Sequence, residues 1–326
     1  MPKSTGAEPS AGQRGSRHPL PLIIMAGSDP QPATLPEAGA KLHPLRGPKG
    51  MALKVRGRPL IDLLLERLRG SGCFEPIFIA GPARVYGAAR AGARVIDTDV
   101  TFGKNIQAAL EEAVVECPGQ PIAVTSCDIL PEVEELHDLM DDYYRNAPLD
   151  FWFPLILAPE EARKLGASAW KPQYRIAPQP GEEPKSLLPG HLVVIDPDAM
   201  RLELVYRSFN VAYAGRNRGI LYRLALIVSH VFVGLLVQDL RQILRLRLPT
   251  LTFTVIHNGV AFALQLRRGV STPDELADRL HRIFVSYRHR RRFPDRRGRL
   301  PLMKALWLAK DIDTVEEARE LAGDFG

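Results

Sequence analysis

The segment PIAVTSCDILP (residues 121–131) begins as an apolar run and ends in a single carboxylate, that of Asp128. Three other short apolar runs likewise stop at small, polar or turn-forming residues: PLIIMAG (21–27), PIFIAGP (76–82) and ARVIDT (93–98). Such runs are typical of buried parallel strands. Helical spacing follows in PLIDLLLERLRGSG (59–72) and GKNIQAALEEAVVECPG (103–119), which end at Gly or Pro-Gly. This alternation predicts a doubly wound, mostly parallel α/β sheet with right-handed crossovers.

Length and composition place the chain among globular proteins. Its 326 residues exceed the roughly 100–200 residues of a usual domain, so one large domain with an insertion and two domains both fit. Hydrophobic residues make up 45% and charged residues 25%, values that argue against wholesale disorder. The three cysteines form no CxxC motif and no metal-binding cluster with histidines, which argues against a disulfide framework or a zinc site. We therefore expect a protein of the reducing cytoplasm.

The net charge of +6 is unevenly distributed, with much of it in RQILRLRL (241–248) and RHRRRFPDRRGR (288–299). For the second run we favour a solvated loop over attraction of a phosphorylated substrate or an anionic membrane surface. Nucleic-acid binding is not expected, because no known module surrounds the run. The apolar stretch 219–238 contains an Arg and a His, which favours a buried helix over a membrane-surface helix or a span. A peripheral membrane contact through 219–247 is a lesser alternative.

Small and acidic residues follow the expected strands at one edge of the sheet. In doubly wound sheets, ligands bind outside the carboxyl ends of the strands. This rule places Gly27, Gly81 and Asp128 together at that edge. Glycine lets backbone N–H groups approach phosphate oxygens closely, and the basic residues of the loop after Gly27 can neutralise phosphate charge. Near the C-terminus, the acidic turn DIDTVEE (311–317) precedes a closing helix, with Thr314 as its N-cap.

The order of these motifs resembles that of the MobA-like NTP transferases. The resemblance rests on the strand ending in Ala-Gly and on six further segments: PKGMAL (48–53), VRGRPLI (55–61), FIAGP (78–82), TFGKNIQAAL (101–110), TSCDILP (125–131) and DIDTVEEARELA (311–322). It covers about half of the chain, at roughly residues 20–132, 189–199 and 305–322. It implies the nucleotide-diphospho-sugar transferase type of α/β fold.

The resemblance also implies an activity: transfer of a nucleoside monophosphate from a triphosphate to a phosphorylated acceptor, with release of pyrophosphate. It divides the chain into a disordered tail (1–19), a nucleotidyltransferase α/β domain (20–200 and 300–326) and a helical, basic insertion that shapes the acceptor site (201–299). Nucleotide contacts are implied for six residues: Ala26, Gly27, Ser28, Gly81, Gly103 and Asn105. Lys49 would bind phosphate, and Asp128 would hold Mg²⁺ with Asp311 or Asp313 as the second ligand.

This set of residues suits the chemistry of nucleotidyl transfer. Attack on the α-phosphorus builds negative charge on phosphate oxygens, so positioning and charge neutralisation do most of the work. Carboxylates hold Mg²⁺ well and thiols do not, so the neighbouring Cys127 is interpreted as packing. Each residue also has a structural alternative: Asp128 as a cap or turn residue, Asp311 and Asp313 in an Asx turn, Asn105 at a helix start and Lys49 in solvent.

Two departures from the family pattern concern the loop AGSDPQPATL (26–35) and the lysine. The loop lacks a second glycine and the usual arginine, for which Arg46 or Lys41 could substitute. Lys54 is the alternative to Lys49 as the phosphate-binding lysine, because Lys49 lies one residue further from the GRP motif (57–59) than is common in the family. A catalytically weak nucleotide-binding protein is therefore an alternative. A glycosyltransferase is a further one, although such enzymes usually present Asp-x-Asp at the metal strand, where SCDIL offers one acid.

Overall fold

The computed structural model describes residues 18–28, 43, 45–161, 164–165, 173–214, 235–236, 239–240, 244, 251–269 and 271–324. The tail expected at residues 1–19 lies almost wholly outside these residues, and so does the segment 219–247, for which a peripheral membrane contact is the lesser alternative. Within the described ranges, no helix combines the length and the apolar character needed to cross a membrane.

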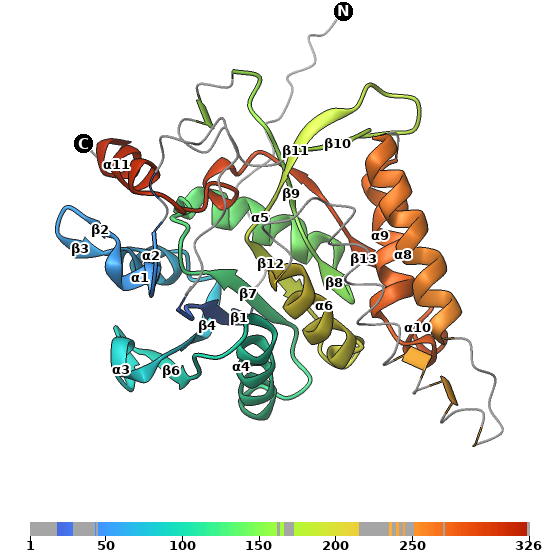
Figure 1. Ribbon diagram of the computed structural model, residues 1–326, viewed down its shortest axis with the longest axis horizontal. Helices are drawn as coiled ribbons and strands as arrows, with labels where there is room; N and C mark the ends of the chain where they lie inside the picture. The colour runs from blue at the N-terminus through green and yellow to red at the C-terminus, as the bar shows by residue number, and fades with distance from the viewer. Residues whose placement is uncertain are drawn as a thin grey trace, which may run out of the picture.

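The main sheet has eight strands, and its centre is parallel (Figure 1). In spatial order the strands are β13 (Gly298–Arg299), β8 (Phe151–Trp152), β12 (Leu192–Ile195), β7 (Ile122–Ser126), β1 (Leu20–Met25), β4 (Phe74–Gly81), β6 (Ala93–Asp97) and β5 (Ala89–Arg90). Parallel pairs join β7 to β1, β1 to β4 and β4 to β6. These are the four apolar runs of the sequence, so the predicted doubly wound, mostly parallel sheet is confirmed. Antiparallel β12 extends it beyond β7.

Helices cover both faces of the sheet because side chains alternate along each strand. On β1, Leu22 and Ile24 point into the core formed with α2 (Leu60–Gly70) and α5 (Val133–Asn146). The intervening Ile23 and Met25 pack on the other face against α4 (Phe102–Glu116). Helix α6 (Leu202–Ala214) lies next to α4 on that second face.

A second, four-stranded sheet continues from the main one. Its order is β10 (Tyr174–Ile176), β11 (Lys185–Pro189), β9 (Leu155–Leu157) and β14 (Leu302–Met303). The apolar run DFWFPLIL (150–157) is therefore divided, with β8 in the main sheet and β9 in the second. Shorter elements complete the description: α1 (Lys49–Ala52), β2 (Lys54–Val55), β3 (Arg58–Pro59), α3 (Ala83–Tyr86), η3 (Leu306–Leu308) and α11 (Val315–Asp324).

The region expected as an insertion contains α6, α8 (Leu251–Arg268), α9 (Pro273–Phe284) and α10 (Tyr287–Arg292). The stretch LTFTVIHNGVAFALQL (251–266) lies in helix α8. Helix α9 starts with a capping box, in which Thr272 Oγ1 accepts a bond from Glu275 N at 3.3 Å. Helices α8 and α9 pack side by side (Figure 1). Strand β13, at the end of this region, pairs with β8 in the main sheet. The domain boundaries themselves stay a prediction.

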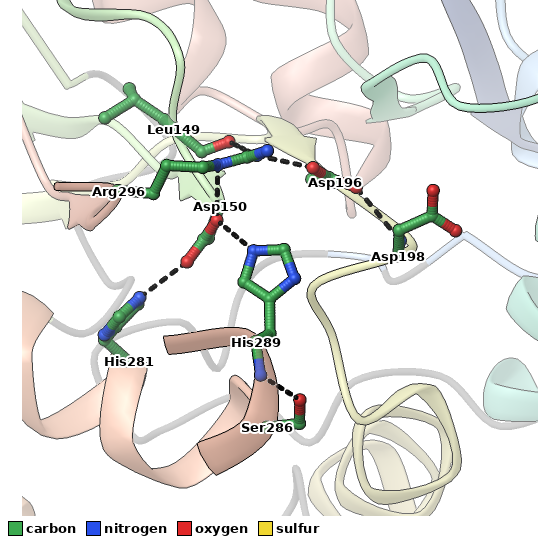
Figure 2. A network of polar contacts seen from close by, with 8 residues as sticks. All are labelled: Leu149, Asp150, Asp196, Asp198, His281, Ser286, His289 and Arg296. Carbon is green, nitrogen blue, oxygen red and sulfur yellow. Dashed lines mark hydrogen bonds and ion pairs between the residues drawn. The ribbon is translucent and has the colours of Figure 1, made fainter. Parts of the chain in front are cut away.

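A buried ion-pair network fixes α9 and α10 to the sheet (Figure 2). Its centre is Asp150, just before β8, whose side chain has no exposed surface. One carboxylate oxygen lies 2.7 Å from His281 Nε2 of α9, and the other lies 3.1 Å from His289 Nε2 of α10 and 2.8 Å from Arg296 Nε. Arg296 also contacts Asp196 after β12. Burial alone would raise the pKa of Asp150, but these partners hold it below its usual value.

Candidate active site

Asp128 stands where the central strand β7 ends, at the carboxyl edge of the parallel sheet. The backbone beyond β7 is fixed by two hydrogen bonds: Cys127 N donates to Met25 O at 3.2 Å, and Ile312 N donates to Asp128 O at 2.9 Å. Ser126 Oγ contacts the Asp128 carboxylate directly. The second bond brings the C-terminal turn to the strand end, so segments 184 residues apart in sequence meet here through the backbone.

The closing turn supplies two further carboxylates. Asp311 and Asp313 lie between η3 and α11, and together with Asp128 they offer oxygens that all lie within 4.8 Å of one another. Thr314 caps α11 as the sequence predicts: its Oγ1 accepts from Glu317 N at 3.2 Å. The Glu317 carboxylate in turn accepts from Asp313 N at 2.7 Å and from Thr314 N at 2.9 Å. This reciprocal cap fixes the backbone that presents Asp313.

Lys49, the first residue of α1, reaches into the carboxylate group. Its Nζ lies 3.2 Å from Asp128 Oδ2 and also contacts Asp313 Oδ1. Burial by itself lowers the pKa of this lysine, but Asp128, Asp313 and Asp311 outweigh that effect and raise the pKa well above its usual value. Lys49 is therefore a cation at neutral pH. Its sequence rival Lys54 lies exposed on β2.

Three of the residues implied in nucleotide contacts line a cavity next to these carboxylates: Gly27, Ser28 and Asn105. A Cβ on Gly27 would come within 2.6 Å of Asn105 Nδ2, so a larger residue would displace that side chain. Asn105 Oδ1 accepts from Thr98 Oγ1 at 2.8 Å and from Val100 N at 2.9 Å. The amide thus holds the loop after β6, and its Nδ2 lies next to Gly27.

Sequence reasoning missed two polar residues at this edge. Asp99 accepts a bond from Ser28 N at 2.8 Å and one from Arg84 at 2.7 Å, so it orders the start of the loop after β1. His191 lies just before β12, and its Nε2 is 3.6 Å from Asp311 Oδ1. Neither residue belongs to a quoted motif. For His191, the one signal in the sequence was its position directly before the strand that pairs with β7.

Ala26, Gly81 and Gly103 do not line the cavity. A Cβ on Gly81 would lie 2.6 Å from Ala26 O, and one on Gly103 would lie 2.3 Å from Tyr206 O of α6. The Gly103 N–H already donates to Asn210 Oδ1 at 2.8 Å. The structure thus shows glycine used for close packing of β4 on β1 and of α4 on α6. Base contacts for these residues stay a prediction.

The candidates for the missing loop arginine do not enter the site in the described structure. Arg46 is exposed and is not among the described residues that line the cavity, and Lys41 lies outside the described residues. Cys127 lines the cavity but is almost wholly buried, and burial raises the pKa of its thiol to about 12. The thiol therefore stays protonated at neutral pH, in agreement with a packing role.

The cavity has a volume of about 1090 Å³. One end holds the carboxylates of Asp128, Asp311 and Asp313 with Lys49. The rest extends over the second face of β7, β12 and β8 and between the helices that flank it. Lining residues there include Met25, Phe102, Ile106, Val124, Phe153, Val193, Ile195, Val205, Phe209, Leu280 and Phe284.

One solved structure agrees with this architecture over nearly the whole chain. A hypothetical transferase from Thermus thermophilus shares 19% identity at a TM-score of 0.54, over 92% of this chain and 99% of its own. Two further structures each align with 62% of this chain and 80% of their own. One is a 4-diphosphocytidyl-2C-methyl-D-erythritol synthase from Anaerococcus prevotii, with 9% identity and a TM-score of 0.36. The other is a CMP:2-keto-3-deoxy-manno-octonic acid synthetase, with 13% identity and a TM-score of 0.39. No curated protein matches the chain.

The sequence also matches a family model. Residues 43–180 match the MobA-like NTP transferase domain, a range that contains Lys49, Asn105 and Asp128. The fold is that of the nucleotide-diphospho-sugar transferases, as expected from the order of the motifs. Residues 43–180 are therefore similar to the MobA-like NTP transferase domain.

Proposed function

We propose that the chain is a Mg²⁺-dependent nucleotidyltransferase that moves a nucleoside monophosphate from a triphosphate to a phosphorylated acceptor. The observation that carries the proposal is the convergence of Asp128, Asp311 and Asp313 around Lys49 at one end of the cavity. These groups come from β7, from the closing turn and from α1, and backbone hydrogen bonds between the segments hold them in place. Such an arrangement suits the binding of a charged phosphate chain.

In the proposed reaction, a phosphate oxygen of the acceptor attacks the α-phosphorus of the triphosphate. A new oxygen–phosphorus bond forms, and the bond from the α-phosphorus to the bridging oxygen of the β-phosphate breaks. The electron pair of the broken bond leaves with pyrophosphate. Charge develops on oxygens that are already negative, so the protein contributes mainly position and charge neutralisation.

The three carboxylates fit a hard divalent cation. Their oxygens lie close enough together to share one ion, and oxygen is the ligand atom that Mg²⁺ prefers. These carboxylates also outnumber the ammonium of Lys49 within the group, so the group is negative and a divalent ion would offset its charge. When bound, Mg²⁺ would supply charge neutralisation at the phosphate oxygens. Asp128 would hold it with Asp311, Asp313 or both.

Lys49 would act as a fixed cation and not as a base. The neighbouring carboxylates raise its pKa, so its ammonium keeps its proton through the reaction. The triphosphate would approach from the β1 side of Asp128, where Gly27 and Ser28 line the cavity next to Asn105. Small residues at that wall allow close approach of phosphate.

Pyrophosphate release tests the proposal. Purified protein with Mg²⁺, a panel of triphosphates and a panel of sugar, polyol, alkyl and cofactor phosphates is compared with the Asp128→Asn variant. We expect turnover to fall about 100-fold or more, because a ligand of the proposed Mg²⁺ is lost and with it charge neutralisation at the reacting phosphates. Asp138→Asn is the matched control, since Asp138 is exposed on α5 away from the cavity. Equal rates for the two variants would contradict the proposal.

Thermal unfolding separates this function from nucleotide binding alone. A triphosphate that raises the melting temperature without any pyrophosphate release, across all acceptors, would indicate a binding protein of the same fold. The melting temperatures of both variants are measured as well. The turnover of Asp128→Asn is then compared with that of Asp138→Asn at an equal fraction of folded protein.

A further inference from the structure

The cavity has an apolar floor on the β12 side of the carboxylates. Along β12, Leu192 and Val194 are buried in the core on the α5 side, whereas Val193 and Ile195 face the cavity and are half-buried. Val193 pairs with Val124 of β7, and Ile195 pairs with Phe151 of β8. Among the residues that the structure describes, the second face of these three strands therefore borders a cavity, where a doubly wound sheet usually carries a packed helix.

Helices from both sides give this part of the cavity apolar walls. Phe102 and Ile106 of α4, Phe209 of α6, and Leu280 and Phe284 of α9 all line it. Phe209 packs edge-on against Phe102, with 5.9 Å between ring centroids, yet 44% of its surface stays exposed. A large aromatic side chain held open to solvent at a cavity wall indicates an apolar ligand there.

The polar and apolar ends of the cavity are arranged along the strands. His191 lies at the start of β12 beside Asp311, and Ile195 lies four residues further along. At a strand rise of about 3.3 Å per residue, these two positions are separated by roughly 13 Å. A ligand with its charged group near the carboxylates and Lys49 would therefore place the rest of its length over Val193 and Ile195.

The sheet order separates this apolar region from the place of the nucleotide. Gly27 and Ser28 follow β1 on one side of β7, whereas β12 and β8 lie on the other side. The volume of about 1090 Å³ slightly exceeds the roughly 300–1,000 Å³ typical of a pocket for one small ligand. Its lining also reaches both sides of Asp128, with Gly27 and Ser28 on the β1 side and Val193 and Ile195 on the β12 side.

We propose that the phosphorylated acceptor carries a long apolar chain. Its phosphate would lie at the Asp128 and His191 end, and its chain would extend over Val193 and Ile195 between α6 and α9. This assignment rests on the proposed nucleotidyl transfer, since it names the class of acceptor for that reaction. The same bonds form and break as above, with the phosphate oxygen of a long-chain phosphomonoester as the attacking atom.

A series of alkyl phosphates from ethyl to decyl tests the assignment, used below the concentrations at which they form micelles. Affinity is measured by calorimetry without triphosphate, and turnover by pyrophosphate release with Mg²⁺ and the preferred triphosphate. We expect affinity to rise by roughly two- to fourfold for each added methylene, the size of effect expected for burial of a CH₂ group. Affinity that does not change with chain length would overturn the assignment.

A charge at the apolar wall gives a second test. Phe209→Glu should weaken decyl phosphate binding at least tenfold and leave ethyl phosphate binding unchanged. Phe253→Glu is the matched control, because Phe253 on α8 is 74% exposed and does not line the cavity. If the two variants bind decyl phosphate equally well, the chain does not lie along α6 and the assignment fails.

The two measurements distinguish failure of this assignment from failure of the proposed function. Turnover that is equal for ethyl and decyl phosphate would refute the apolar acceptor and leave nucleotidyl transfer standing. Chain-length-dependent binding without any pyrophosphate release would refute the transfer, and with it the acceptor role, although the apolar region would remain a ligand site.

Discussion

Replacing Asp150 by alanine should release α9 and α10 from the sheet. The carboxylate is fully buried and both its oxygens are engaged, by His281 on one side and by His289 and Arg296 on the other (Figure 2). Alanine would leave these three side chains without their common partner. Arg296 would keep two contacts, with Asp196 and with the carbonyl of Leu149.

The magnitude follows from the burial of the group. Removing one partner of a buried ion pair costs about 3–5 kcal/mol. Since Arg296 retains other acceptors, we expect the lower end, about 3 kcal/mol. For a folded unit of 150–250 residues, 1 kcal/mol shifts the melting temperature by about 2–4 °C, so the expected decrease is about 6–12 °C. Asp278→Ala is the matched control: Asp278 is exposed on α9 and pairs with Arg282 at 2.9 Å, a kind of contact that contributes about 0.5 kcal/mol or less.

Urea unfolding and hydrogen exchange provide the assay. Urea titrations give the free energy of unfolding of the wild type and of both variants, and amide exchange shows where protection is lost. We expect exchange in α9 and α10 to accelerate most in Asp150→Ala. A loss of stability no larger than that of Asp278→Ala, or uniform exchange across the sheet, would refute the reasoning.

The network also gives a pH dependence with a defined sign. Its partners hold the pKa of Asp150 below the usual value, so the carboxylate binds a proton less readily in the folded chain than in the unfolded chain. Its contribution to stability is therefore complete above a pH of about 4 and is lost as the pH falls through the lowered pKa. The difference in unfolding free energy between wild type and Asp150→Ala should shrink over that acidic range, which titrations of stability against pH would show.

Two substitutions test the walls of the site. Gly27→Ala should lower the free energy of unfolding by about 1–3 kcal/mol and raise the KM for triphosphate about tenfold or more, because the new Cβ would displace the buried Asn105 from the loop it holds. Steady-state kinetics check this, and an unchanged KM would count against the placement of the nucleotide. Thr314→Ala should lower the free energy of unfolding by about 1 kcal/mol through loss of the helix cap, and equal stability of variant and wild type in urea would contradict that role.

Much of the sheet could be predicted because its information is local. The runs around Ile23, Phe78 and Val124 are apolar, short and bounded by turn residues, and each forms a parallel strand. The edge rule for such sheets then placed Asp128, and the resemblance to a known family pointed to Asp311 and Asp313 in the closing turn. Their convergence depends on the backbone bond between Ile312 and Asp128, which no local pattern encodes.

The glycines could not be assigned by sequence, because close packing and ligand approach require the same residue. Gly27 opens onto the cavity, whereas Gly81 and Gly103 each give space to a backbone carbonyl. The Asp150 network was missed for a related reason. His289 and Arg296 lie in the basic run 288–299, whose composition favours a solvated loop, and only the tertiary structure shows that both side chains point inward.

At two places in the sequence, a residue of the Asp150 network is adjacent to a residue that lines the cavity. Stability and acceptor binding should therefore be coupled. Asp150 precedes Phe151 in the cavity lining, and His281 follows Leu280 in the cavity wall. Loss of the ion pairs would therefore free the α9 wall at the point where an apolar chain would lie. The carboxylates at the other end are fixed separately, through the bonds of Asp128 and the closing turn. Asp150→Ala should thus lower the affinity for decyl phosphate more than the affinity for triphosphate. A smaller fraction of folded protein would affect the binding of both ligands equally and would not produce this difference.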